Sequence, residues 1–298
     1  MKGFQMFNPD HENTGKTNYS PELISQYFDE LGVKEWDRLT NTPADEVSLY
    51  IHTHYLKKHI SQGDQILEVG AGAGRFTQIL AGLGTQIMVA DISRVQLDLN
   101  KQLAHEFGFD QAVKDWRQLD ICDMSDFDPY SFDCVVAYGG PFSYVLDKRD
   151  LALSECLRVL RPGGLLFLSV MSLWGTAHGF LNGVLSMPVA ANQEITKSGD
   201  ITPQNFPERK NNFMHMFRVD ELTNWLEKRG LIILDRSASN CISLTWNATL
   251  SQIKDDTEKW NELLRMELEA CAEAGCLNMG THLIVVAKKK HKEGVTPI

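Results

Sequence analysis

Residues 66–77 read Ile-Leu-Glu-Val-Gly-Ala-Gly-Ala-Gly-Arg-Phe-Thr. The apolar start predicts a buried strand, and apolar residues at helical spacing after the glycines predict a helix. Because glycine has no Cβ, the alternating Gly70, Gly72 and Gly74 allow a sharp turn and a close approach of the backbone to a ligand. Free N–H groups at the start of the helix favour a negative or strongly polar ligand group. The stretch therefore predicts the opening of a nucleotide-binding βαβ unit.

The spacing of these glycines separates two classes of nucleotide-binding protein. The dinucleotide fingerprint Gly-x-Gly-x-x-Gly would need a third glycine at position 75, which is Arg75. Glu68 stands two residues before the first glycine, and in this form the stretch resembles the first motif of class I S-adenosylmethionine (SAM)-dependent methyltransferases. The resemblance implies SAM as the cofactor, S-adenosylhomocysteine (SAH) as its product, and cofactor contacts from Glu68, Gly70, Ala71, Gly72 and Gly74.

A second acid ends the next predicted strand. Residues 86–90 are mostly apolar and lead to Asp91, 21 residues after the first glycine of the motif. A carboxylate at this place accepts hydrogen bonds from two ribose hydroxyls in NAD enzymes and SAM enzymes alike, so it indicates adenosine recognition without choosing between them. Asp91 could instead be an ordinary helix cap. The run 91–97 resembles a methyltransferase segment, which implies that Gln96 lines the adenine, with Ile92 also in the site.

Two further ligand positions follow the third and fourth predicted strands. Asp120 and Ile121 come after strand 113–118, where the resemblance implies that the carboxylate binds the exocyclic amine of adenine and the next backbone N–H binds the ring. Asp120 could also be an ordinary loop acid. Tyr138 ends strand 132–138, and ligands of open α/β sheets bind at the carboxyl ends of the strands.

The later chain continues the alternation of strands and helices. A Leu-Arg-Pro-Gly-Gly turn at 160–164 precedes strand 165–171 and is typical of the methyltransferases, so the resemblance covers 64–171 without a break. Alternation of this kind implies an α/β fold with a doubly wound, mostly parallel sheet. The resemblance implies a Rossmann-like sheet of seven strands whose last strand is antiparallel.

The region before the sheet contains two helix starts. Ser20-Pro21 and Thr42-Pro43 each combine a capping side chain with a proline at the first helical position. The resemblance implies that helices within 1–62 close over the cofactor, although packing against the sheet edge is the plain alternative. Arg38 could bind a ligand carboxylate or form a surface salt bridge.

We expect residues 63–298 to form the methyltransferase domain itself. Two stretches, at about 172–213 and 240–280, are longer than the connections of a minimal fold. Long loops at a ligand-binding edge often act as lids, so we interpret both stretches as helical cap insertions.

Composition limits the partners. A net charge of −10 argues against a general polyanion binder, because non-specific nucleic-acid affinity comes from phosphate neutralisation. The start does not have the pattern of a signal peptide, and no run of 18 apolar residues predicts a membrane span. The six cysteines contain no Cys-x-x-Cys pair, which predicts reduced thiols in a cytoplasmic protein without a metal site.

Methyl transfer from a sulfonium is an in-line displacement that depends mainly on the positioning of the two reactants. A base is needed only if the acceptor must lose a proton, and the candidates are His215, His178 and Tyr144. The motif of exocyclic-amine methyltransferases is absent after the fourth strand, and the chain has no Pro-Cys dipeptide of the cytosine C5 type. These features favour a small-molecule acceptor. The alternatives are a catalytically silent SAM-binding regulator and, against the glycine spacing, an NAD-dependent oxidoreductase.

Overall fold

The computed structural model describes residues 19–203, 205 and 213–290. Its centre is a seven-stranded sheet with the strand order β3-β2-β1-β4-β5-β9-β8. The strands are β1 (Gln65–Val69), β2 (Gln86–Asp91), β3 (Val113–Gln118), β4 (Phe132–Ala137), β5 (Leu160–Met171), β8 (Leu231–Ala238) and β9 (His282–Lys289). Neighbouring strands are parallel except at β9, which pairs antiparallel with β5 and with β8. The predicted doubly wound sheet with an antiparallel last strand is confirmed.

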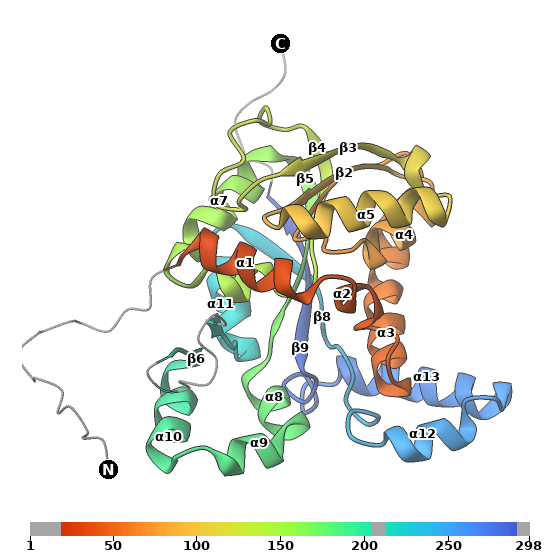
Figure 1. Ribbon diagram of the computed structural model, residues 1–298, viewed down its shortest axis with the longest axis vertical. Helices are drawn as coiled ribbons and strands as arrows, with labels where there is room; N and C mark the ends of the chain where they lie inside the picture. The colour runs from red at the N-terminus through yellow and green to blue at the C-terminus, as the bar shows by residue number, and fades with distance from the viewer. Residues whose placement is uncertain (1–18, 204, 206–212, 291–298) are drawn as a thin grey trace, which may run out of the picture.

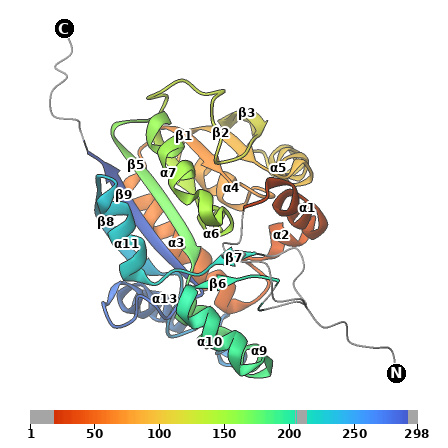
Figure 2. The ribbon, with the colours of Figure 1, turned by 90° about the vertical axis from the view of Figure 1, so that its left-hand side faces the viewer.

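Helices cover both faces of this sheet (Figures 1 and 2). One face packs against α6 (Pro141–Tyr144), α7 (Arg149–Val159) and α11 (Val219–Lys228). The other packs against α3 (Pro43–His59), α4 (Arg75–Gly82), α5 (Arg94–Glu106) and α13 (Thr257–Ala272). Successive strand residues alternate between the two cores, as Ile66 and Leu67 do in β1, because side chains of a strand point to opposite faces.

The predicted turn at 160–164 is instead a bulge within β5. The register between β4 and β5 jumps from Phe132 opposite Leu160 to Cys134 opposite Leu165, so the intervening residues project from the ladder. A Cβ on Gly164 would lie 2.8 Å from the carbonyl oxygen of Asp133, so only glycine lets the bulge pack this closely. The strand therefore begins at Leu160 and not at Leu165.

The two predicted helix starts before the sheet are present. The hydroxyl of Ser20 accepts from the N–H of Leu23 at the start of α1 (Pro21–Leu31), and Thr42 forms a capping box with Asp45 at the start of α3. The short helix α2 (Lys34–Asp37) lies between them. Residues 1–18 of the predicted N-terminal region lie outside the described residues.

The two long insertions contain helices below the carboxyl edge of the sheet (Figure 1). The first contains α8 (Leu173–Gly179), α9 (Leu181–Ser186), α10 (Val189–Ser198) and a small sheet of β6 (Asp200–Ile201) and β7 (Met214–His215). The second contains α12 (Asn247–Ile253) and α13. Residues 204 and 206–212 of the first insertion lie outside the described residues. The structure also contains two single turns of 3-10 helix, at Asp110–Ala112 and Leu146–Lys148.

The membrane prediction concerns helices only. Across residues 19–203, 205 and 213–290, none of the helices combines the length and the apolar character needed to cross a bilayer.

Candidate active site

The glycine motif forms one wall of a cavity at the carboxyl ends of β1, β2 and β4, which we call the glycine-loop cavity. Its remaining walls come from α1, α2 and the segments after β3 and β4. The lining residues are Tyr19, Ile24, Phe28, Glu35, Arg38, Leu39, Val69, Gly70, Ala71, Gly72, Ala73, Gly74, Arg75, Phe76, Asp91, Ile92, Leu119, Ile121, Tyr138, Gly139, Pro141, Tyr144 and Val145. Most of the predicted cofactor residues are thus brought together.

Glycine is required in this loop for two separate reasons. Gly70 and Gly74 have φ angles of +66° and +101°, a left-handed region that side chains disfavour. A Cβ on Gly70 would also lie 2.5 Å from Cγ of Pro141, and one on Gly74 would lie 2.8 Å from the amide nitrogen of Asn100. The loop is therefore packed tightly against Pro141 and Asn100, and its backbone lines the cavity.

Asp91 is fixed at the rim of the loop. One carboxylate oxygen accepts from the N–H of Gly72 and the other from the N–H of Ser93, each at 2.8 Å. The side chain is 6% exposed, and burial, assisted by the nearby charge of Glu35, raises the pKa of Asp91 to about 6. Each oxygen keeps a further lone pair, so the carboxylate can accept from a ligand while it holds the loop.

Glu68 lies behind the loop and does not line the cavity. Its carboxyl is buried and accepts from the hydroxyl of Thr77 at 2.7 Å, which ties β1 to α4. Burial raises the pKa of Glu68 to about 8, so the group is mostly protonated at neutral pH. This geometry fits support of the glycine loop better than the predicted contact with a ligand.

Asp120 and Gln96 are likewise set back from the cavity. The carboxylate of Asp120 accepts from the hydroxyl of Tyr19 at 2.9 Å and from the N–H of Cys122 at 2.8 Å. Gln96 donates from its amide to the carbonyls of Phe28 and Gly32, which fixes the turn after α1. Their predicted adenine contacts stay predictions. In the described structure Asp120 holds Tyr19, and Gln96 holds the turn after α1. Tyr19 and residues of α1 line the cavity.

A second cavity adjoins the first, and we call it the cap cavity. The two share Phe28, Glu35, Arg38, Leu39, Gly139 and Tyr144 as lining residues. The other walls of the cap cavity come from α1, α3, β5, the two insertions and the start of β9. They consist of Tyr27, Leu31, Thr42, Ala44, Asp45, Ser48, Met171, Gly179, Phe180, Met214, Asn240, Leu244, Asn247, Thr281 and His282.

Arg38 and Tyr144 stand at the boundary between the cavities. The guanidinium of Arg38 donates to the carboxylate of Glu35 at 2.8 Å and lies against the backbone of Gly139. The ring of Tyr144 packs edge-on against Phe28 at 5.3 Å. Tyr138 differs from these two, because its ring is buried against His52 and its hydroxyl has no hydrogen-bond partner among the described residues.

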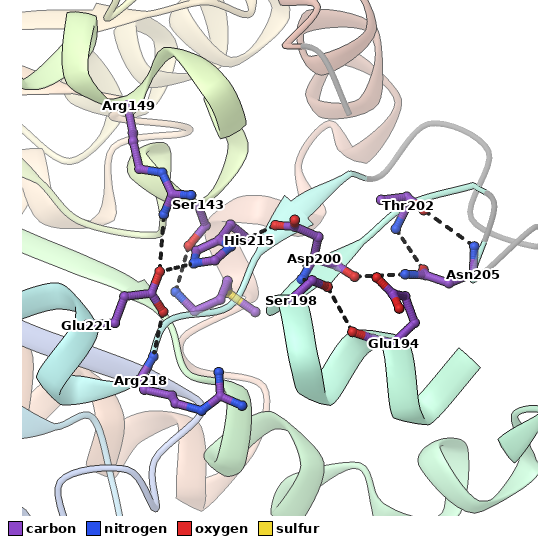
Figure 3. Close-up of polar contacts among 11 residues, drawn as sticks. Ser143, Arg149, Glu194, Ser198, Asp200, Thr202, Asn205, His215, Arg218 and Glu221 are labelled. Carbon is purple, nitrogen blue, oxygen red and sulfur yellow. Dashed lines mark hydrogen bonds and ion pairs between the residues drawn. The ribbon is translucent and has the colours of Figure 1, made fainter. Parts of the chain in front are cut away.

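His215, the favoured base candidate, has a structural role, because its ring bridges two carboxylates from different elements. Figure 3 shows its ring between Asp200 of β6 and Glu221 of α11. Nδ1 lies 2.7 Å from Asp200 and Nε2 lies 2.7 Å from Glu221, which Arg149 also approaches at 3.4 Å. Both nitrogens are therefore occupied, and the residue lines neither cavity. His178 is exposed on α8 and also lines neither cavity, so the geometry favours neither histidine as the base.

Replacing His215 by alanine is expected to destabilise the fold by about 2 kcal/mol, because two partly exposed carboxylates lose their hydrogen bonds to the buried ring. Burial alone would lower the pKa of His215, but its bonds to Asp200 and Glu221 outweigh burial and raise it. The contribution is therefore complete below the unfolded pKa of about 6.5 and is lost as pH rises through the folded pKa. Urea unfolding at several pH values measures the difference between the two proteins.

The control for this prediction is His178→Ala, which removes an exposed histidine from the first insertion. It should leave the free energy of unfolding nearly unchanged at every pH. An equal effect of both substitutions, or a His215→Ala effect that grows above neutral pH, would contradict this structural role of His215.

Several lining residues have no strong signal in the sequence. Tyr19 and Phe28 come from the region before the sheet, and Glu35 is recognisable only by its position three residues before Arg38. His282 reaches the cap cavity because β9 inserts between β5 and β8, an order that the chain's sequence does not reveal.

Comparisons with known proteins find methyltransferases among those similar to this chain. A family model described as a methyltransferase domain matches residues 67–168, which contain the glycine motif, Asp91 and Asp120. The ubiquinone biosynthesis O-methyltransferase of Stutzerimonas stutzeri is 24% identical over 229 residues, which are 76% of this chain and 88% of that protein. The tRNA 5-carboxymethoxyuridine methyltransferase of Escherichia coli O157:H7 is 25% identical over 230 residues, 76% of this chain and 80% of that protein.

A solved structure extends the likeness over nearly the whole chain. The cyclase SpnF superposes with a TM-score of 0.60 at 20% sequence identity, covering 94% of this chain and 100% of SpnF. At this identity the likeness concerns the fold alone. The names of these proteins differ in the molecules on which they act, so they do not identify the acceptor of this chain.

Proposed function

The chain belongs to the class I SAM-dependent methyltransferases, and we propose that it transfers the methyl group to a small-molecule acceptor bound in the cap cavity. The observation that carries this proposal is that the two cavities share lining residues. An in-line transfer needs an acceptor atom about 3 Å from the methyl carbon, so the two binding sites must meet.

The described residues fit the cofactor at the glycine-loop cavity. The glycines offer bare backbone, and the ionised Asp91 has lone pairs for ribose hydroxyls. Arg38 is the cation nearest the shared wall and would bind the carboxylate of the cofactor. When bound, SAM supplies an activated methyl group on a positive sulfur. We propose further that the helices of residues 1–62 close over it.

Small size of the acceptor is supported by the lining and charge of the cap cavity. Its walls come from helices of the N-terminal region and from both insertions, so an acceptor bound there would contact several separate segments of the chain. Glu35 and Asp45 contribute carboxylates, and Arg38, whose Nε donates to Glu35, keeps its other N–H groups for the carboxylate of the cofactor. A nucleic-acid acceptor would bring phosphates toward these acids and toward a chain of net charge −10. A cytoplasmic location is part of the same proposal.

The test is a transfer assay with isotopically labelled SAM and two pools of acceptors, one of small metabolites and one of total tRNA. Label in a small molecule, with none in the tRNA, is the expected result. Label confined to tRNA would refute the proposed acceptor class, although the enzyme class would stand. Calorimetric titration with SAH, run in parallel, shows that the protein used is competent for its cofactor.

A substitution that fills the cap cavity gives a second test. Leu244 lines the cap cavity but not the glycine-loop cavity. Leu244→Trp is therefore expected to raise the acceptor KM about tenfold or more while SAH affinity stays unchanged. Ile242→Trp in the same loop is the control, because Ile242 is exposed and lines neither cavity. Equal KM values for Leu244→Trp and the unsubstituted enzyme would place the acceptor elsewhere.

A further inference from the structure

We propose that His282 is the general base of the transfer and that the acceptor is an aromatic hydroxyl compound that loses its proton in the reaction. The proposal rests on the proposed function, since it requires the acceptor to bind in the cap cavity. His282 lines that cavity, whereas His215 and His178 are not among its lining residues.

His282 is held from one side and free on the other. It is the first residue of β9 and pairs with Met171 of β5, which also lines the cap cavity. Its backbone N–H donates to the hydroxyl of Ser239, and its ring Nδ1 lies 3.3 Å from the hydroxyl of Thr281. Within the described part of the chain Nε2 makes no hydrogen bond. If Nδ1 carries the proton toward Thr281, Nε2 keeps a lone pair for an acceptor.

Burial, assisted by nearby groups, keeps this imidazole neutral. His52 of α3 lies against the ring, and the titratable and charged groups that line the cap cavity with His282 are Glu35 of α2, Arg38, Asp45 of α3 and Tyr144 of α6. Burial chiefly, and then Arg38 and His52, hold the pKa of His282 well below its usual value. The ring is therefore neutral near pH 7 and can accept a proton, although it is a weaker base than a free imidazole.

The neighbouring titratable side chains are less suited to the role. His52 is buried, with Nδ1 at 2.8 Å from the carbonyl of Ser48 and Nε2 at 2.9 Å from the hydroxyl of Ser169, so neither nitrogen is free. Tyr144, the candidate predicted from the sequence, stands at the shared wall, but a phenol accepts a proton only after it has ionised, ordinarily near pH 10. His282 has neither limitation.

The walls of the cap cavity indicate the class of acceptor. Tyr27, Phe28, Tyr144 and Phe180 contribute aromatic surface suited to packing against a planar ring. A neutral amine is already nucleophilic and needs no base, whereas an aromatic hydroxyl gains reactivity as its proton leaves. A base beside aromatic walls therefore favours a phenol-type acceptor.

The step balances without any further reactant. The acceptor oxygen forms its bond to the methyl carbon while the carbon–sulfur bond breaks, and that electron pair stays on the now neutral sulfur. The hydroxyl proton moves to Nε2 of His282. After the methyl ether leaves, the imidazolium returns its proton to water.

The experiment compares the unsubstituted enzyme, His282→Gln and the control His178→Gln on phenol, 4-fluorophenol and 4-nitrophenol across pH 6 to 10. At pH 7 we expect His282→Gln to lose about 100- to 10,000-fold in kcat on phenol. The loss should shrink on 4-nitrophenol and at high pH, where the acceptor ionises unaided. His178→Gln should match the unsubstituted enzyme throughout.

Two further readouts separate a base from a merely structural residue. Affinity for SAH, measured by calorimetry, should be the same in His282→Gln, and NMR titration of the His282 ring in the SAH complex should give a pKa below 6.5. A constant loss over all pH values and all three phenols would overturn the proposal, as would full activity of His282→Gln. Failure of the unsubstituted enzyme on phenols, with activity on another small molecule, would overturn it and leave the proposed function intact. Label confined to tRNA would refute both.

Discussion

Asp91→Ala is expected to weaken SAH binding by about 100-fold or more. A hydrogen bond to a charged acceptor contributes about 1.5 to 3 kcal/mol, and the carboxylate is placed to accept from two ribose hydroxyls. Asp91 lines the glycine-loop cavity and is oriented by the N–H groups of Gly72 and Ser93. Calorimetric titration of both proteins with SAH measures the change.

A matched ligand separates ribose recognition from damage to the loop. The SAH analogue without the 2′- and 3′-hydroxyls should bind the unsubstituted enzyme more weakly than SAH does. The Asp91→Ala protein should bind SAH and this analogue with about equal affinity. If the substitution weakened SAH and the analogue by equal factors, the loss would come from the loop and the ribose assignment would fail. Because the pKa of Asp91 is raised to about 6, SAH affinity of the unsubstituted enzyme should also fall as pH drops below 6.

Gly175→Ala is expected to destabilise the protein by about 3 kcal/mol or more, although alanine is ordinarily favoured over glycine in a helix by about 1 kcal/mol. Gly175 lies in α8, and a Cβ there would stand 1.6 Å from the carbonyl oxygen and 2.2 Å from the carbonyl carbon of Gly280. These atoms are backbone, so the segment that leads into β9 would have to move. Denaturant unfolding measures the loss.

Gly183→Ala is the control for this substitution. Gly183 lies in α9, and a Cβ there would meet no atom within 4 Å, so alanine should raise stability by about 0.5 to 1 kcal/mol. Opposite signs for the two substitutions are the expected result. A neutral Gly175→Ala would show that the contact between α8 and the start of β9 is looser than described.

Most of the predicted residues that line the glycine-loop cavity could be found from the sequence, because their signals are local. The glycine motif, the acid that ends β2 and the residues after β3 each follow directly from a strand, and parallel strands bring their carboxyl ends to one edge. Sequence spacing alone did not distinguish residues that line the cavity from residues that support its walls. Glu68 and Gln96 match the family pattern, yet Glu68 supports the glycine loop from behind and Gln96 holds the turn after α1.

The acceptor half depends on contacts between segments that are distant in the chain. His215 was favoured from its sequence context, but Asp200 and Glu221 occupy both of its nitrogens, and no spacing rule predicts that pairing. His282 gave no signal at all, because its place beside Met171 follows from the insertion of β9 between β5 and β8. The sequence by itself determined the βαβ unit and the sheet class, since periodicity and turn chemistry act within a few residues, and its resemblance to the methyltransferases implied the cofactor. Only the tertiary structure decided which polar side chains are free to act, because packing between distant elements occupies some and leaves others facing a cavity.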